Sequence, residues 1–311
     1  MHPAYSVIFF TTASGAGYGL MFWLGLAHVA GLLPDSRWLP FLALATALVL
    51  VTAGLFSSTF HLGHPERAWR ALSQWRSSWL SREGIAALAT YVPAGLLALV
   101  WLFGVQTPLS PLLGLLVAAG AVVTVWCTGM IYASLRTIRQ WHQPLVPLVY
   151  LGLAAASGAL LLALILAFSG LYWPAVLASG SLVLALLLKL AYFARIDGDR
   201  GAYTAQMALG LDAEAQIRVL DPPHTRPNFI MREMGYEIGR RHATRLRRIA
   251  LVALFAVPIP LAGLVVLGSG LSPLMLAVAT LSAGIGLLVE RWLFFAEAEH
   301  VSMLYYGRPR A

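Results

Sequence analysis

A polar segment interrupts an otherwise apolar sequence between residues 60 and 84. It holds two histidines, two glutamates, four arginines and three tryptophans, with His61 near its start and Glu83 near its end. An imidazole, with a pKa of about 6.5, can donate or accept a hydrogen bond and can gain or lose a proton near neutral pH. A carboxyl group close to it can carry that proton onward. His61 and Glu83 are therefore candidates to bind a ligand oxygen and to exchange protons with it.

The alternative interpretation of the same two residues is structural. In that case His61 caps the helix before the segment, and Glu83 pairs with an interfacial arginine. Spacing places His61 at the end of one apolar run and Glu83 at the start of the next, so adjacent antiparallel helices would bring them to similar depth under either interpretation. Residue types and spacing alone leave both interpretations open.

The composition of the whole chain shows whether the protein lies in water or in a membrane. Hydrophobic residues make up 59% of the chain and charged residues 11%, and the mean hydropathy is +0.76. Soluble globular proteins average about 25% charged residues, so the composition requires a lipid bilayer as the partner. The net charge of +8 would also suit nucleic acid, but the basic residues lie where membrane topology would place them, and we expect no nucleic acid partner.

The sequence predicts an all-α integral membrane protein with eight transmembrane helices in a bundle, forming a single domain over residues 1–311. A helix needs roughly 20 apolar residues to cross a hydrocarbon core of about 30 Å. The first run is too long for a signal peptide and lacks a basic region before it, so we expect it to stay as a helix. The eight runs lie at about residues 8–33, 40–60, 84–104, 111–133, 145–169, 174–194, 249–268 and 273–296.

Basic residues predict the orientation of the bundle. All 21 lysines and arginines except Arg37 lie in the connections after the second, fourth and sixth runs, in the C-terminal tail, or at the helix ends beside them. The positive-inside rule makes that face cytoplasmic, with both termini, in a multi-pass protein of the inner membrane. The longest connection, 195–248, has two compatible interpretations: an anchor on anionic lipid, or a docking surface for a peripheral subunit.

A histidine such as His61 can donate a hydrogen bond to a quinone oxygen or accept one from it. Glycines at positions 15, 17 and 19 predict close helix packing and not a nucleotide-binding loop, because no strand precedes them. Cys127 is the only cysteine, which excludes an intrachain disulfide and a cysteine-ligated iron–sulfur cluster within this chain.

Three stretches of the sequence resemble the DmsC family, the membrane-anchor subunits of dimethyl sulfoxide reductase-type molybdoenzymes. They are MHPAYSVIFFTT at residues 1–12, SGAGYG at 14–19, and the segment that runs from HLGHPERA at 61–68 to WLSRE at 79–83. The resemblance implies an anchor without haem that exchanges electrons between membrane quinone, ubiquinone or menaquinone, and a four-cluster iron–sulfur subunit. That subunit connects to a molybdopterin catalytic subunit on the cytoplasmic face. The family's quinone-site histidine and acidic residue fall on His61 and Glu83.

Within this family, the motif HPERAW at residues 64–69 and the expected cytoplasmic orientation are most similar to the SoeC-type anchors of cytoplasmic sulfite dehydrogenases. This resemblance implies that electrons pass from sulfite into quinone. A dimethyl sulfoxide reductase anchor would use the same site in reverse and oxidise quinol. In both cases the chain itself is not catalytic for the terminal substrate, but it carries the quinone redox site of an oxidoreductase complex.

Further residues are candidates for the same site. Those near the quinone would be His64, Arg67, Arg82, Tyr132 and Arg136. Lys189, Glu290 and Arg291 are ionisable residues near the ends of the sixth and eighth runs, where they form a proton path, extend to the membrane interface or pair with one another.

Two other function classes have to be weighed. A dihaem cytochrome needs paired histidines at matching depth, and only His28 lies inside a predicted span away from the basic face, which favours packing for His28 and no haem. A secondary transporter for a small anion would have eight helices too. Transporters usually carry charged groups near the bilayer midplane, whereas the ionisable residues here cluster at one face.

Overall fold

The computed structural model describes residues 2–60, 62–198, 203–218, 220–221, 226, 228–236, 238–268 and 270–308. Eight of its helices are long and apolar enough to cross a membrane, with 22 to 25 residues each. They are α1 (Tyr5–Val29), α2 (Trp38–Thr59), α3 (Trp79–Phe103), α4 (Ser110–Ala133), α5 (Leu145–Ala167), α6 (Pro174–Gly198), the helix Ala243–Val266 and α12 (Ser272–Ala296). The prediction of an all-α membrane protein with eight spans is confirmed.

The seventh span is continuous but changes its winding. It consists of α10 (Ala243–Leu251), the π-helical η2 (Val252–Ala256) and α11 (Pro258–Val266). Pro258 has no amide hydrogen to donate, which accounts for the irregular turn before it. Five short elements complete the described part of the chain: the 3₁₀ helix η1 (Pro65–Gln74), α7 (Ala205–Leu209), α8 (Phe229–Met234), α9 (Ile238–Arg241) and the 3₁₀ helix η3 (Val301–Tyr306).

Among the helix boundaries that differ from the prediction, three have a clear local reason. The first span ends at Val29 and not at residue 33, because Gly31 adopts a left-handed conformation with φ of 66°. The third begins at Trp79 and not at residue 84, because the Ser78 hydroxyl caps it by accepting a hydrogen bond from the Ser81 amide. The seventh begins at Ala243 and not at residue 249. Hydropathy missed its first turns because they carry several arginines.

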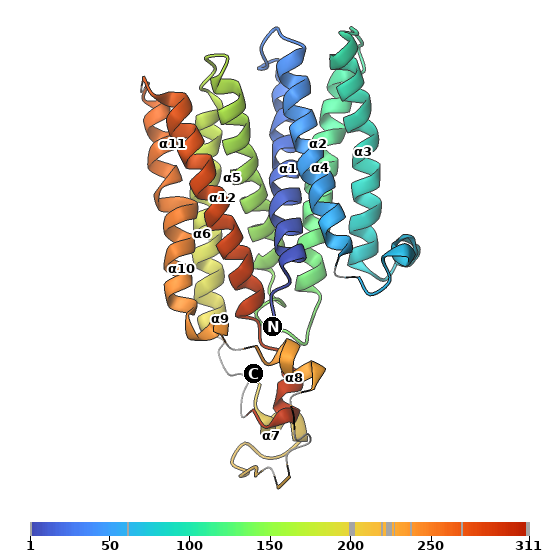
Figure 1. The fold of residues 1–311 in the computed structure, drawn as a ribbon, viewed down its shortest axis with the longest axis vertical. Helices are drawn as coiled ribbons and strands as arrows, with labels where there is room; N and C mark the ends of the chain where they lie inside the picture. Colours follow the sequence, from blue (N-terminus) through green and yellow to red (C-terminus); the bar gives the residue numbers. More distant parts are fainter. Residues whose placement is uncertain are drawn as a thin grey trace.

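Helix α1 lies at the centre of the bundle, in contact with α2, α4, α5 and α12. Figure 1 shows α2, α3 and α4 on one side of α1, and α5, α6 and α10 to α12 on the other. Both chain ends lie at the same end of the bundle, beside α7 and α8. The two halves of the bundle meet around α1 and along α4 and α5, and the cavity described below lies where α1, α4, α5 and α12 come together.

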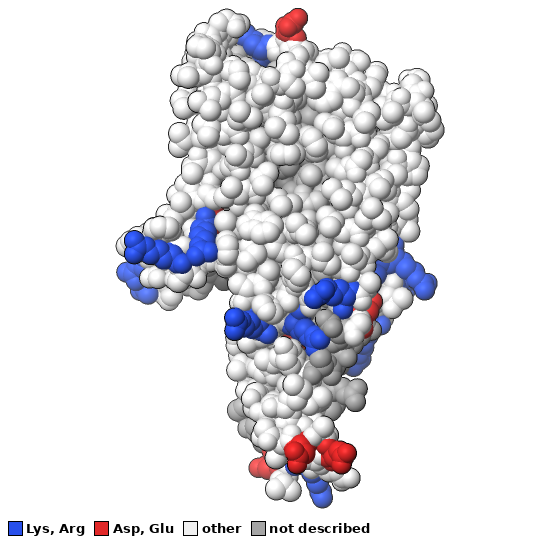
Figure 2. All heavy atoms as spheres, turned by 180° about the vertical axis from the view of Figure 1, so that it is seen from behind, with Lys and Arg blue, Asp and Glu red and all other residues white. Residues whose placement is uncertain are grey.

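Charged side chains are distributed unevenly along the long axis. Figure 2 shows lysine and arginine gathered around the end that carries the short elements, while the apolar middle of the visible face is almost free of charge. Only a small patch of basic and acidic atoms is visible at the opposite end (Figure 2). This distribution agrees with the alternation of basic and short connections in the sequence.

Two glycines allow α1 to approach α5 and α2 at backbone distance. A Cβ atom at Gly19 would lie 1.7 Å from the Ala154 carbonyl oxygen of α5, and one at Gly17 would lie 2.7 Å from the Ala47 carbonyl oxygen of α2. The prediction of close packing is confirmed for these two residues. It is wrong for Gly15, where an added Cβ would meet nothing within 4 Å.

We expect Gly19→Ala to destabilise the bundle by about 1–3 kcal/mol, because overpacking forces α1 and α5 apart. Gly15→Ala on the same helix is the matched control, since its Cβ enters open space. The measurement is the thermal unfolding midpoint of the detergent-purified protein. Equal midpoints for the two variants would contradict the close approach.

Candidate functional site

Glu83 lies inside the bundle and not at its surface. It is the fifth residue of α3, with 4% of its surface exposed, and its carboxylate accepts a hydrogen bond from the Thr128 hydroxyl of α4. The interpretation in which Glu83 pairs with an interfacial arginine is wrong. The neighbouring Arg82 donates to the carbonyl oxygens of Trp75, at 2.9 Å, and Arg76, at 2.7 Å. Arg82 thus fastens the polar segment to α3 and does not neutralise the carboxylate.

His61 lies outside the described residues, so its distance from Glu83 stays a prediction. Its two neighbours are described. Phe60 is the C-terminal cap of α2, and the Leu62 amide donates to the Thr59 carbonyl oxygen at 3.1 Å. Helices α2 and α3 are in contact. Phe60 and Leu62 therefore lie at the end of a helix that contacts α3.

The residues that follow His61 face outward. His64 Nδ1 lies 3.0 Å from a Glu66 carboxylate oxygen, and Arg67 Nε lies 3.7 Å from the same oxygen. All three side chains are more than half exposed. The structure therefore does not bring His64 and Arg67 together with Glu83, although both were candidates for the same site.

The η1 helix is strongly amphipathic and projects from the side of the bundle next to the ends of α2 and α3 (Figure 1). The Ser81 hydroxyl donates to the Ala71 carbonyl oxygen and so ties η1 to the start of α3. Arginine guanidinium groups lie over three tryptophan rings, in the pairs Arg70 with Trp69, Arg76 with Trp75, and Arg82 with Trp79. Such pairs suit a membrane–water interface, where the ring meets lipid and the cation meets head groups.

Tyr132 and Arg136 lie in different surroundings. Tyr132 is buried in an aromatic cluster with Trp141, Tyr150 and Phe294, whose ring centroids are 5.2–5.7 Å from its own. Arg136 is exposed in the connection after α4. Tyr132 and Arg136 were both candidates for the quinone site, but the structure places one in the interior and the other at the surface.

Lys189, Glu290 and Arg291 form a buried triad between α6 and α12. Their side chains are only 2% exposed. The Lys189 ammonium donates to one Glu290 carboxylate oxygen, and Arg291 Nε donates to the other at 2.5 Å. The interpretation that these residues pair with one another is confirmed. The triad holds two cations and one carboxylate, so it carries an excess positive charge.

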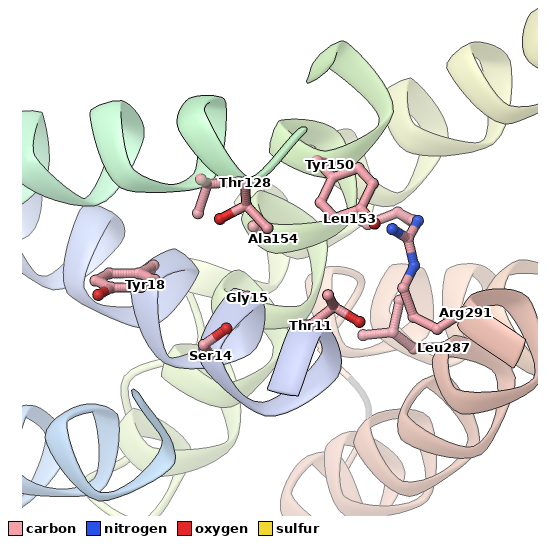
Figure 3. Close-up of a pocket in the computed structure, with 11 residues that line it drawn as sticks. Thr11, Ser14, Gly15, Tyr18, Thr128, Tyr150, Leu153, Ala154, Leu287 and Arg291 are labelled. Atoms are coloured by element: carbon pink, nitrogen blue, oxygen red, sulfur yellow. The ribbon is translucent and has the colours of Figure 1, made fainter. Parts of the chain in front are cut away.

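A small cavity lies between Thr128 and Arg291, where α1, α4, α5 and α12 meet (Figure 3). Its volume is about 20 Å³. The side chains that give it a polar wall are Thr11, Ser14, Tyr18, Thr128, Tyr150 and Arg291. The cavity therefore has Glu83's hydrogen-bond donor on one side and the triad on the other.

Sequence reasoning missed this cavity, although one signal was present. Thr11, Ser14 and Tyr18 are spaced by three and four residues, which puts three hydroxyl groups on one face of the first helix. Their partners on α5 and α12 are more than 130 residues away in the chain. No sequence pattern connects the two sets.

An apolar groove of about 210 Å³ borders the polar cavity. It is open, and it runs between α1, α4 and α5, with Tyr18, Val125 and Ala154 lining both spaces. Small residues form much of its floor, including Gly19, Ala121 and Ala155. A flexible apolar chain fits such a groove, whereas a charged ligand does not.

The remaining histidine and cysteine candidates have ordinary packing roles. His28 Nε2 lies 3.1 Å from the Ser110 hydroxyl, and its ring packs edge-on against Trp101. Cys127 is a buried free thiol. Among the residues that the structure describes, no group of three or more His, Cys, Asp or Glu side chains is arranged to hold a metal ion.

The sequence model of the family described as "DMSO reductase anchor subunit (DmsC)" matches residues 1–298. The chain belongs to the DmsC family. A sulfite dehydrogenase subunit from Allochromatium vinosum is 39% identical, with 98% of this chain and 99% of the relative covered. The family is one of anchor subunits, which decides against the transporter alternative for this DmsC protein.

Two relatives from Escherichia coli, both named as anaerobic dimethyl sulfoxide reductase chains, match over a shorter length. The first is 31% identical over 39% of this chain and 43% of its own. The second, named YnfH, is 33% identical over 38% of this chain and 42% of its own. The DmsC-family protein is therefore similar over its whole length to a sulfite dehydrogenase subunit, and only partly to the dimethyl sulfoxide reductase proteins.

We expect Thr128→Val to lower the free energy of unfolding by about 1–3 kcal/mol, because it leaves the buried Glu83 carboxyl without its donor. Thr128→Ser keeps the hydroxyl and should stay within about 1 kcal/mol of the wild type. Chemical or thermal unfolding in detergent measures both. An unchanged Thr128→Val protein would show that this hydrogen bond does not support the carboxyl.

Glu290→Gln should cost about 3–5 kcal/mol, because it leaves two buried cations without a counter-charge. Glu66→Gln removes a carboxylate from an exposed pair and should cost at most about 1 kcal/mol. Yield and unfolding midpoint of the two variants provide the comparison. If both changes had equally small effects, the triad would not be buried as described.

Proposed function

We propose that this DmsC-family protein is the anchor of a molybdopterin oxidoreductase complex and exchanges electrons between membrane quinone and an iron–sulfur subunit. The observation that carries the proposal is Glu83, a carboxyl group buried beside the end of the helix that precedes His61. A carboxyl group is costly to bury in a membrane protein and marks a functional site by default. Its threonine partner leaves it free to take up or release a proton.

The described residues suit a quinone in two respects. Thr128 and Glu83 supply polar groups on the side of α4 that faces the bundle interior, and the groove between α1, α4 and α5 accepts an apolar tail. When bound, a quinone supplies two-electron, two-proton chemistry. In this chain, the imidazole of His61 would hydrogen-bond a quinone oxygen, and the carboxyl group of Glu83 would hold the proton to be transferred.

The proposed orientation has the basic end, both termini and the connection 195–248 in the cytoplasm. The gathering of lysine and arginine at that end supports it through the positive-inside rule (Figure 2). The protein would then be a multi-pass protein of the inner membrane. The short helices α7 and α8 beside the chain ends would meet the four-cluster iron–sulfur subunit, which in turn would contact the molybdopterin catalytic subunit.

Sulfite is the proposed electron source. The supporting observation is the whole-length similarity to a protein named as a sulfite dehydrogenase subunit. Electrons would then flow from sulfite, through the catalytic and iron–sulfur subunits, into quinone. The second candidate is the reverse direction, with quinol oxidised for a dimethyl sulfoxide reductase, which the two partial matches favour.

We expect His61→Ala to abolish quinone-coupled turnover while the complex still assembles, because it removes the proposed hydrogen bond to the quinone. Glu83→Gln should lower turnover by about 100-fold, the low end of the contribution of a positioned acid or base. His142→Ala is the control, since His142 is an exposed histidine in the connection after α4. Sulfite-dependent quinone reduction in membranes measures turnover, and co-purification of the partner subunits measures assembly.

Retained quinone reduction in His61→Ala would remove that residue from the proposal. Purification tests the wider assignment. The tagged chain should bring iron and molybdenum with it in stoichiometric amounts. A chain that purifies alone from membranes that contain its neighbouring subunits would contradict the anchor function.

A further inference from the structure

We infer that the small cavity between α1, α4, α5 and α12 holds ordered water, and that this water connects Glu83 through Thr128 to the Lys189–Glu290–Arg291 triad as a proton relay. The inference rests on the proposed function, because it supplies protons to the same carboxyl group. It assigns a role to residues in the second half of the chain. The polar segment that carries His61 belongs to the first half.

Unpartnered polar atoms around the cavity require an occupant. Nη1 and Nη2 of Arg291 and the hydroxyl oxygens of Tyr18 and Tyr150 are buried without a hydrogen-bond partner among the described residues. Arg291 is 2% exposed, and its guanidinium carbon lies 4.1 Å from the centroid of the Tyr150 ring. In Figure 3 its guanidinium group lies beside Tyr150 at the edge of the space that Thr11 and Thr128 also line. Buried donors of this kind almost always find protein or water partners.

The size of the cavity selects water as that occupant. A volume of about 20 Å³ holds one water molecule, for which about 10–15 Å³ is needed, and it is far too small for a quinone ring. A buried water typically makes about three hydrogen bonds. Arg291, Tyr150 and Thr128 supply donors and acceptors on three walls, so the site satisfies water and excludes the quinone itself.

The positive charge of the triad makes the cavity a suitable proton path between the buried carboxyl groups of Glu83 and Glu290. The triad carries an excess positive charge, and Arg291 presents it to the cavity. Glu83 lies behind Thr128 on the other side. An arginine stays protonated in a protein, so Arg291 orients the water but does not itself pass a proton. Glu290 and Lys189 are the members of the triad that can gain and lose one.

The triad continues toward the basic end of the molecule. The Phe193 ring lies near two cations, with Lys189 Nζ 4.5 Å and Arg247 Cζ 4.4 Å from its centroid. Arg247 in turn bonds Glu297, at 2.8 and 3.0 Å, and Asp197, at 2.7 Å. The Asp197 side chain is 42% exposed. Charged groups thus lie on both sides of the Phe193 ring, between the triad and a surface that water reaches.

The relay has to supply the two protons that quinone reduction consumes. Reduction of one quinone takes two electrons from the iron–sulfur partner and two protons, and forms two O–H bonds on the ring oxygens. Glu83 gives up one proton for each of the two O–H bonds, and after each transfer it takes one back from the cavity water through the Thr128 hydroxyl. Glu290 and Lys189 return a proton to that water from the aqueous end. Quinol oxidation runs the same transfers in reverse.

Filling the cavity tests the relay without touching its polar groups. Gly15 lines the cavity, and an added Cβ there meets nothing within 4 Å, so Gly15→Val adds apolar atoms at the cavity wall without a steric clash. Gly284→Val is the matched control, because Gly284 of α12 also has open space around its Cβ and does not line the cavity. Both variants are assayed in the whole membrane-bound complex.

We expect Gly15→Val to lower kcat for quinone-coupled turnover by about 10-fold, to leave KM for quinone unchanged and to raise the solvent deuterium isotope effect. Gly284→Val should match the wild type in all three. An unchanged kcat in Gly15→Val would overturn the relay. A rise in KM with kcat preserved would also overturn it, because it would place the quinone itself in the cavity.

High-resolution electron microscopy of the wild-type complex provides a test that does not depend on the variant folding. Density for water between Thr128 and Arg291 is expected, and an empty or lipid-filled cavity would overturn the relay. Failure of the relay is distinguishable from failure of the proposed function. If Glu83→Gln loses turnover while Gly15→Val keeps it, the quinone site stands without this proton path, and if Glu83→Gln also keeps turnover, the quinone site itself is wrong.

Discussion

The absence of water from the bilayer interior is the constraint on which this structure depends. Any ionisable group inside the bundle must find its partner within the protein, since lipid offers none. Glu83 meets this requirement through a single threonine, and Glu290 meets it through two cations. These two kinds of partner affect proton exchange differently. A carboxyl group with a neutral partner can change its proton occupancy readily, whereas a carboxylate held between Lys189 and Arg291 is stabilised as an anion and exchanges protons only together with its neighbours.

The central position of α1 places polar groups between the two halves of the bundle. Gly17 and Gly19 let α1 approach α2 and α5 at backbone distance, and this close approach places the hydroxyl groups of Thr11 and Ser14 between the two halves of the bundle. Gly15, on the same helix, leaves space instead of closing it. A difference of two residues along one helix thus separates a packing contact from a polar cavity, because successive residues point about 100° apart.

The two ends of the molecule have different tasks in this arrangement. The basic end carries η1, both chain ends and the short helices α7 and α8, and the Arg247–Asp197 ion pair reaches the surface there. Electron transfer to a peripheral partner and proton exchange with water would then use the same face. The whole-length similarity to a sulfite dehydrogenase subunit is consistent with an anchor in which both halves contribute.

The sequence by itself determined the eight spans, the asymmetry of charge and the family, because hydropathy, basic residues and short motifs are local properties. It also identified Glu83, Lys189, Glu290 and Arg291, since ionisable residues are conspicuous in apolar runs. Only the tertiary structure decided their partners. Thr128 lies 45 residues from Glu83, and Glu290 lies 101 residues from Lys189. Contacts across such separations depend on how helices rotate and pack against one another, which apolar periodicity does not specify in helices that are apolar on nearly every face.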